Sequence, residues 1–177
     1  SEVNMKLHIG GTQAKEGWKV LDIQSAPHVD YVADIRDLSQ FSDESFDEIY
    51  ASHVAEHIPY SNDELVKVLA GFCRILKAQG VLKLSVPDME TLCWMFTSPR
   101  LTGDAKFHIM RIIFGGQMDA HDYHYVGLSF DILQGFLSKA GFEKIERVKG
   151  FGLFDDSSSQ TLAGIPISLN VEARRQA

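Results

Sequence analysis

Cysteine is scarce in this sequence. Only two of its 177 residues are cysteines, Cys73 and Cys93, and both stand inside apolar stretches. A disulfide framework needs more cysteines, and a zinc site built on them needs a tighter cluster. We therefore interpret both as buried, reduced thiols of a cytoplasmic protein.

Long apolar runs are also missing. No stretch has the roughly 20 apolar residues that a membrane-spanning helix needs. The start, Ser1–Asn4, has neither the basic nor the apolar region of a signal peptide. We expect no contact with a membrane and a cytoplasmic location.

An excess of positive charge is absent too. The chain has 17 Lys and Arg residues against 24 Asp and Glu residues, which gives a net charge of −7. A protein that binds nucleic acid through a broad basic face normally has the opposite sign. DNA and RNA are therefore not expected as partners.

The composition that remains is that of one soluble domain. Apolar residues make up 45% of the chain and charged residues 23%, close to the average for globular proteins. We see no internal repeat and no linker that divides the chain. A single domain with an ordinary apolar core is expected.

Apolar patterns predict strands and helices in alternation, which indicates an α/β fold. A capping box of Ser61 and Glu64 begins the first helix, and Gly80 ends it. Ser129 caps the last helix, and Gly141 ends it. The expected strands are residues 5–9, 18–23, 29–33, 46–51, 81–86, 143–149 and 165–171, and two further helices are residues 89–96 and 106–114.

The early connections are short. Only residues 10–17 join the first two strands, whereas a crossover between parallel neighbours usually takes a dozen residues or more. Either these strands are not a standard βαβ pair, or the helix has been trimmed to a loop. Residues 24–45 show no convincing helix either. One sheet face is then thinly covered, and because an uncovered apolar face tends to find a partner, we predict a homodimer.

Several strands end in residues that suit a ligand site, since open α/β sheets bind ligands at the carboxyl ends of their strands. The first ends in Gly10 and Gly11, a turn that lacks the G-x-G-x-x-G pattern of dinucleotide sites. Asp22 ends the second strand. A carboxylate there can accept hydrogen bonds from both hydroxyls of a ribose, or it can simply cap a loop. Asp34, with Ile35, ends the third and suits an adenine amino group beside an apolar side chain.

Taken together, these residues resemble class I S-adenosylmethionine-dependent methyltransferases, and more closely a compact bacterial branch of predicted methyltransferases. The resemblance covers nearly the whole chain and is specific as a set of motifs. The matching segments are residues 6–11, 16–23, 32–38, 45–57, 74–77 with Gly80, 85–88, 114–117 and 166–171.

The resemblance implies a single-domain, Rossmann-like methyltransferase fold over residues 1–177, with a mostly parallel sheet, a terminal antiparallel hairpin and trimmed early helices. Residues 89–127 would form a helical segment on the substrate side. S-adenosylmethionine would be the cofactor. Its contacts would be Gly10 and Gly11 to the methionine part, Asp22 to the ribose and Asp34 with Ile35 to the adenine, while Ser52 and His53 would flank it and face the substrate.

The chain departs from the family pattern at the first turn. Family members usually have Gly-x-Gly there, whereas this chain has Gly10-Gly11-Thr12, one residue short. A missing glycine puts a Cβ atom where the carboxypropyl group of the cofactor passes. The departure bears directly on whether the cofactor binds.

A hydroxyl or amine acceptor must lose a proton, so a nearby base helps methyl transfer. We take His53, His121 and His124 as the catalytic candidates. His57 is also explained as a helix-end or core histidine, Asp88 as a helix N-cap, and Glu56 as a local pair or cap.

Residues 119–124 contain two aspartates and two histidines at close spacing. They can form an acceptor-binding loop, a solvated packing loop or a metal site. The resemblance requires no metal, and we expect none.

The favoured function is methyl transfer to a small-molecule or glycan acceptor. The alternative is a non-catalytic, degenerate methyltransferase fold that binds or assembles with a partner. A nicotinamide-dependent dehydrogenase is disfavoured because the G-x-G-x-x-G pattern is absent.

Overall fold

The computed structural model describes residues 4–177. The expectation of no signal peptide rests largely on residues 1–3, which lie outside the described residues. The elements in chain order are β1 (Lys6–Ile9), β2 (Trp18–Asp22), β3 (Tyr31–Val32), β4 (Phe46–Ser52), η1 (Ala55–His57), η2 (Ser61–Asp63), α1 (Glu64–Ile75), β5 (Leu76–Pro87), α2 (Met89–Phe96), α3 (Gly103–Phe114), α4 (Phe130–Ala140), β6 (Phe142–Val148), η3 (Ser157–Ser159), β7 (Thr161–Leu162), β8 (Ile165–Pro166) and β9 (Ser168–Arg175).

Seven of the strands form one sheet in the order β3-β2-β1-β4-β5-β9-β6. The pairs from β3 to β5 are parallel, while β9 runs antiparallel to both β5 and β6. The short strands β7 and β8 form a separate antiparallel pair. The predicted α/β fold, a mostly parallel sheet with an antiparallel end, is confirmed.

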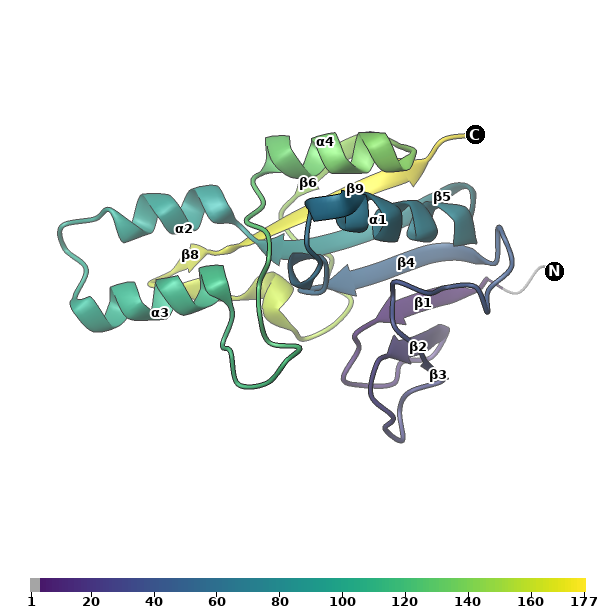
Figure 1. Cartoon of the computed structure of the whole chain (residues 1–177), viewed down its shortest axis with the longest axis horizontal. Helices are drawn as coiled ribbons and strands as arrows, with labels where there is room; N and C mark the ends of the chain where they lie inside the picture. The colour runs from purple at the N-terminus through teal and green to yellow at the C-terminus, as the bar shows by residue number, and fades with distance from the viewer. Residues whose placement is uncertain (1–3) are drawn as a thin grey trace.

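Helices α1 and α4 lie side by side on one face of this sheet (Figure 1). Their apolar sides and the inward-facing residues of the strands form the main core. A smaller core joins α2 and α3 away from the sheet. The largest fully buried side chains are Tyr50, Phe46, Phe72, Phe142, Leu7, Ile9, Leu21, Ile49, Leu65, Leu69, Ile75 and Leu76.

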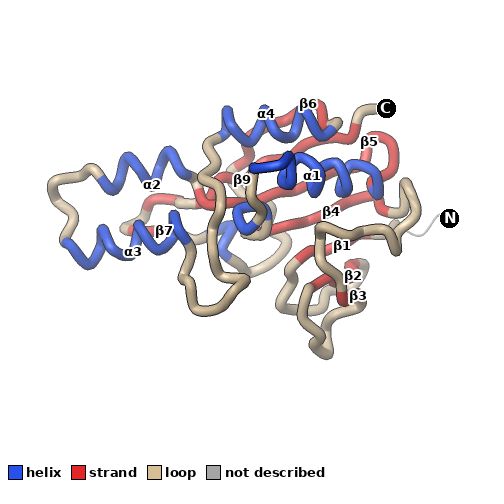
Figure 2. The backbone as a smooth tube through the Cα atoms, viewed as in Figure 1, coloured by secondary structure: helices blue, strands red, loops and turns tan. Residues whose placement is uncertain are grey.

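The early helices are trimmed to loops. β1 and β2 are parallel neighbours, with Lys6 opposite Trp18, yet residues 10–17 between them contain no helix. Figure 2 shows the whole segment from β1 to β4 as strands and loops. Of the two alternatives for this short connection, the trimmed crossover is therefore the right one.

The face left without these helices carries a network of ion pairs on β1, β4 and β5. Lys6 and Glu48 are paired across β1 and β4, and the Lys6 ammonium lies 3.6 Å from the Glu48 carboxylate. Lys83 on β5 forms a second ion pair with Glu48. The reason given for a homodimer, an uncovered apolar face, is therefore wrong for this part of the sheet, and the homodimer stays a prediction.

Residues 149–160 cover the carboxyl-end part of the same face. The Phe154 ring lies 3.9 Å from the ring of His8 and 4.9 Å from that of Tyr50, centre to centre. The Tyr50 hydroxyl donates a hydrogen bond of 2.7 Å to Asp156. Residues 149–160 thus cover part of the sheet face that the missing helices leave open.

The first helix differs from its prediction at both ends. Asn62 and Asp63 have left-handed backbone angles, so Ser61 lies in a separate turn and α1 begins without a side-chain cap. At the other end Leu76 already pairs with Phe46 in the sheet, and α1 stops at Ile75 instead of at Gly80. Sheet pairing overrides the local helical pattern.

Two expectations about individual residues can be judged here. Cys73 is buried as expected, but Cys93 is exposed, because it lies on the outer side of α2.

Within residues 4–177, none of the helices has both the length and the apolar character needed to cross a membrane.

Ser129 and Ser61 offer a matched test of the two predicted caps. Ser129 accepts a hydrogen bond from the backbone N–H of Ile132, whereas Ser61 caps nothing. We expect Ser129→Ala to lower the free energy of unfolding by about 1 kcal/mol and Ser61→Ala to leave it nearly unchanged, measured by urea unfolding. Equal losses in the two variants would contradict this interpretation.

His8 makes stability depend on pH. Its side chain is 4% exposed, and burial lowers its pKa to about 4. The unfolded chain, with a His pKa near 6.5, therefore binds the proton more readily, so stability is lost as pH falls from about 6.5 towards 4, by at most about 3 kcal/mol. The free energy of unfolding of His8→Leu should therefore change less between pH 6.5 and 4 than that of the parent protein. His108→Leu, at an exposed histidine, is the control and should keep the parent's pH dependence.

Candidate functional site

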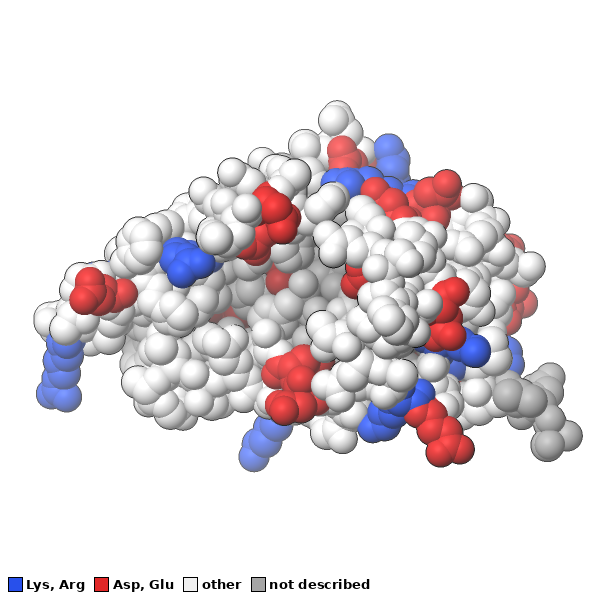
Figure 3. All heavy atoms as spheres, turned by 90° about the horizontal axis from the view of Figure 1, so that it is seen from below, with Lys and Arg blue, Asp and Glu red and all other residues white. Residues whose placement is uncertain are grey.

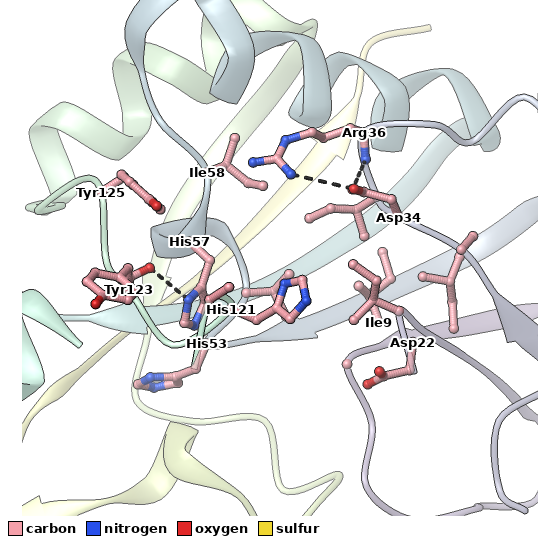
Figure 4. Close-up of a pocket in the computed structure, with 17 residues that line it drawn as sticks. Ile9, Asp22, Asp34, Arg36, His53, His57, Ile58, His121, Tyr123 and Tyr125 are labelled. Atoms are coloured by element: carbon pink, nitrogen blue, oxygen red, sulfur yellow. Dashed lines mark hydrogen bonds and ion pairs between the residues drawn. The ribbon is translucent and has the colours of Figure 1, made fainter. Parts of the chain in front are cut away.

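A pocket of about 230 Å³ lies at the carboxyl ends of β1, β2 and β4. Figure 4 shows Asp22 and Asp34 on one side of it and His53, His57 and His121 on the other. Figure 3 shows the molecular surface hollowed between the lobe of α2 and α3 and the rest of the molecule. The pocket is lined by Ile9, Gly10, Leu21, Asp22, Ile23, Ala33, Asp34, Ile35, Arg36, His53, Val54, His57, Ile58, Ala120, His121, Tyr123 and Tyr125.

Two carboxylates of the pocket are held by their own turns. One oxygen of Asp22 accepts a hydrogen bond of 2.8 Å from the backbone N–H of Gln24. Asp34 likewise accepts one of 2.9 Å from the N–H of Arg36, whose guanidinium lies 3.5 Å away. Such Asx turns fix each carboxylate and leave acceptor capacity for a ligand.

Gly10 is the glycine that the pocket requires. Its φ is +72°, and a Cβ atom there would lie 3.0 Å from a methyl group of Val54. Gly11 is buried against the His8 ring on the other face of the sheet and does not line the pocket. Of the two glycines predicted to contact a cofactor, only Gly10 lines this pocket.

Ser52 is also turned away from this pocket. It lies in register with Ser85 and lines a separate hollow of about 150 Å³ together with Asp156 and Thr12. Neighbouring residues of a strand point to opposite faces, so Ser52 faces residues 149–160 while Ala51 faces the core. Asp22, Asp34 and Ile35, by contrast, do line the main pocket.

His53 lies where three hollows meet. It lines the main pocket, the hollow beside Ser52, and a third cavity of about 250 Å³. Its Nε2 is 2.9 Å from the hydroxyl oxygen of Ser168, and that hydroxyl donates to the carbonyl oxygen of Ser157. The hydroxyl proton is thus already used, so His53 Nε2–H donates to Ser168 and the lone pair of a neutral ring is on Nδ1.

The third cavity lies between the sheet and the lobe of α2 and α3. Its wall combines groups of both charges and neutral polar groups with apolar ones, and the side chains of Arg111, Asp122 and His124 are among them. The lining residues are His53, Pro87, His108, Arg111, Ile112, Gly116, Asp122, His124, Gln160 and Ile167.

The aspartates of residues 119–124 serve the loop itself. Asp119 accepts a hydrogen bond of 2.7 Å from the backbone N–H of His121, and Asp122 accepts one from that of Met118. The loop also lets its two histidines diverge, because His121 lines the main pocket and His124 lines the third cavity. The four residues therefore do not form one ligand cluster.

Glu56 is a functional candidate that sequence reasoning treated only as a local pair or cap. Its side chain is buried, and neither carboxylate oxygen accepts a hydrogen bond among the described residues. The Nδ1 of His53 lies 3.4 Å from it and the Nε2 of His124 lies 4.0 Å away. Burial lowers the pKa of His124, an effect that the nearby Glu56 carboxylate partly offsets. The Glu-His pair directly after β4 was the signal in the sequence.

Asp88 has a structural role at the start of α2, whereas His57 combines a local role with a place in the main pocket. Asp88 is the N-cap of α2, as predicted, and it also forms an ion pair with Arg147. His57 is the last residue of η1, which agrees with a helix-end histidine, but it also lines the main pocket.

Residues 12–84 match a protein family described as a methyltransferase domain. Solved structures of the same fold include a SAM-dependent methyltransferase from Archaeoglobus fulgidus, with a TM-score of 0.60 and 13% identity, in which the match covers 98% of this chain and 87% of the other. The fold is that of class I methyltransferases. The resemblance found in the sequence is confirmed at this level, while the compact bacterial branch stays a prediction.

Two further structures span more than this methyltransferase fold. The CurJ carbon methyltransferase has a TM-score of 0.60 and 15% identity, and the match covers 100% of this chain and 50% of CurJ. CalH in complex with SAH has a TM-score of 0.57 and 17% identity, with coverage of 97% and 51%. The chain thus spans about half the length of these two proteins. A search of curated proteins found no match.

Gly10 can be tested against a glycine that has room for a side chain. We expect Gly10→Ala to lower the free energy of unfolding by about 1–2 kcal/mol, because the alanine must adopt a left-handed backbone beside Val54. Gly135→Ala lies inside α4 with no atom within 4 Å of the new Cβ and should raise it by about 0.5–1 kcal/mol. Urea unfolding of both variants measures the difference, and a neutral Gly10→Ala would contradict the assigned strain.

Proposed function

We propose that this chain binds S-adenosylmethionine in the main pocket and transfers its methyl group to a small-molecule or glycan acceptor. One observation carries the proposal. Asp22, Asp34 and Ile35, from the ends of two successive parallel strands, line one pocket together with Gly10. The carboxyl edge of an open α/β sheet is where ligands of such folds bind.

The residues present fit this cofactor. Asp22 would accept from the ribose hydroxyls, and Asp34 would accept from the adenine amino group beside the apolar side chain of Ile35. Gly10 leaves open the space that a Cβ would fill beside Val54. The shortened early connections keep these walls, so the trimmed helices do not remove the pocket.

The bound cofactor would supply the activated methyl group, and the protein's task is to align the acceptor and exclude water. The loop between α3 and α4 covers one side of the pocket with Tyr123 and Tyr125. The backbone N–H of Tyr125 donates a hydrogen bond of 2.8 Å to the carbonyl of Glu56, which fastens this loop to the end of β4.

The third cavity suits the acceptor, because His53 lines both it and the main pocket. With Nε2–H donated to Ser168, His53 would take the acceptor proton at Nδ1. His124 lines the acceptor side and His121 the cofactor side, so their predicted catalytic roles are kept as part of this proposal. The polar wall of the cavity supports a hydroxylated or otherwise polar acceptor.

Calorimetry with S-adenosylmethionine and S-adenosylhomocysteine tests the proposal. We expect binding of both, and an affinity at least about tenfold lower in Asp22→Asn and in Asp34→Asn, because each loses a charged hydrogen-bond acceptor. Asp37→Asn is the matched control, since Asp37 forms a similar turn with Ser39 outside the pocket. NAD should give no heat.

Absence of heat with either sulfur nucleoside at millimolar concentration would overturn the enzyme assignment. Equal losses in Asp37→Asn and Asp22→Asn would show that the pocket carboxylates have no specific role.

A further inference from the structure

The buried carboxylate of Glu56 has no lysine, arginine or hydrogen-bond donor beside it among the described residues. The residue is 1% exposed, and both of its side-chain oxygens lack a hydrogen-bond donor among the described residues. Within residues 4–177, the basic side chains within 4.0 Å of it are those of His53 and His124, which are charged only if protonated, and no lysine or arginine lies that close. A buried carboxylate is costly unless a cation or several donors face it.

The rings of His57 and His124 bond through Nδ1 to backbone carbonyls and not to this carboxylate. His57 Nδ1 lies 3.0 Å from the carbonyl oxygen of Tyr123, and His124 Nδ1 lies 2.8 Å from that of Ile112. A carbonyl only accepts, so both rings donate through Nδ1–H, and in a neutral ring the lone pair is on Nε2. His124 Nε2 is the atom that lies 4.0 Å from Glu56.

One potential ligand atom from each of Glu56, His57 and His124 lies within 4.8 Å of the other two. Histidines that bind metals commonly donate their second ring N–H to a backbone carbonyl, which is the arrangement found at both rings here. Two imidazoles and one carboxylate are a known three-ligand set for Zn²⁺, with a further position left open.

We propose that Glu56, His57 and His124 bind one divalent transition-metal ion, of which Zn²⁺ is the best match. Imidazole nitrogens favour zinc over the oxygen-preferring Mg²⁺ and Ca²⁺. In tetrahedral zinc sites the ligand atoms lie about 3.3 Å apart, so the three side chains would draw together around the ion. The ion supplies the positive charge that Glu56 otherwise lacks.

This site differs from the one that the sequence suggested. Residues 119–124 raised a metal site of His121 with His124, and the expectation was that no metal binds. The structure separates these two histidines into different cavities and instead brings His124 to the Glu-His pair after β4. A metal ion here would fasten the loop between α3 and α4 to the end of β4.

Zinc binding can be measured without any methyl acceptor or S-adenosylmethionine, so its outcome is independent of the proposed function. The protein is stripped with a chelator and titrated with Zn²⁺ against a chromophoric competitor, in a Cys93→Ser background that removes the exposed thiol. We expect one Zn²⁺ per chain and a higher melting temperature with Zn²⁺, and no such shift with Mg²⁺.

Variants identify the ligands. Loss of a residue that only supports a ligand typically costs about 10–100-fold in metal affinity, so Glu56→Gln, His57→Ala and His124→Ala should each cost about 100-fold or more. His121→Ala, in the same loop but outside the three-residue set, should keep the affinity within about twofold.

The melting temperature of each metal-free variant shows whether that variant is correctly folded. Glu56→Gln removes a buried charge, so it should melt at or above the temperature of the metal-free parent while its zinc-dependent shift is lost. If instead Glu56 simply shares a proton with the histidines, Glu56→Gln would melt lower and the parent would show no stoichiometric zinc binding. That result, or an equal loss of zinc affinity in His121→Ala, would overturn the proposal.

Discussion

The parallel pairing of β1 with β2 through a connection of residues 10–17 alone is the constraint on which the rest of the structure depends. Residues 10–17 leave no room for a crossover helix, so one face of the sheet has no helical cover at its start. Two features protect this face. Glu48 binds Lys6 and Lys83 across the strands, which places ion pairs on the open face, and residues 149–160 pack Phe154 on His8 and Tyr50. Both are solutions to the same problem, because a bare apolar face would be exposed to water.

The same pairing also creates the candidate site. Parallel strands end at one edge of the sheet, and Asp22 and Asp34 there face one pocket with Gly10. The opposite wall comes from later in the chain, from η1 and from the loop between α3 and α4. The hydrogen bonds of Tyr125 N–H to the Glu56 carbonyl and of the His57 ring to the Tyr123 carbonyl join the two walls. His53 then lies at the junction between the pocket and the third cavity. The proposed cofactor, acceptor and metal sites thus meet where η1 contacts the loop between α3 and α4.

Local signals in the sequence were sufficient where the structure obeys local chemistry. Ser129 begins α4 and Gly141 ends it, as predicted. An N-cap hydroxyl and a left-handed glycine need only the backbone of the helix that they flank. The capping box at Ser61 failed, because Asn62 and Asp63 adopt left-handed angles that separate it from α1. The helix end at Gly80 failed as well, since Leu76 pairs with Phe46 in the sheet. Both errors arise where contacts distant in the chain compete with a local pattern.

The sequence by itself determined most of the order of strands and helices, the shortness of the early connections, and the positions of Asp22 at the end of β2 and Asp34 two residues after β3, because each depends on neighbours within a few residues. Only the tertiary structure decided that Gly11 and Ser52 face away from the pocket, that His121 and His124 enter different cavities, and that Cys93 is exposed. It alone brought His124 to Glu56 and His57. The physical reason is that these placements depend on how a long loop packs against the end of β4, and spacing along the chain contains no information about that contact.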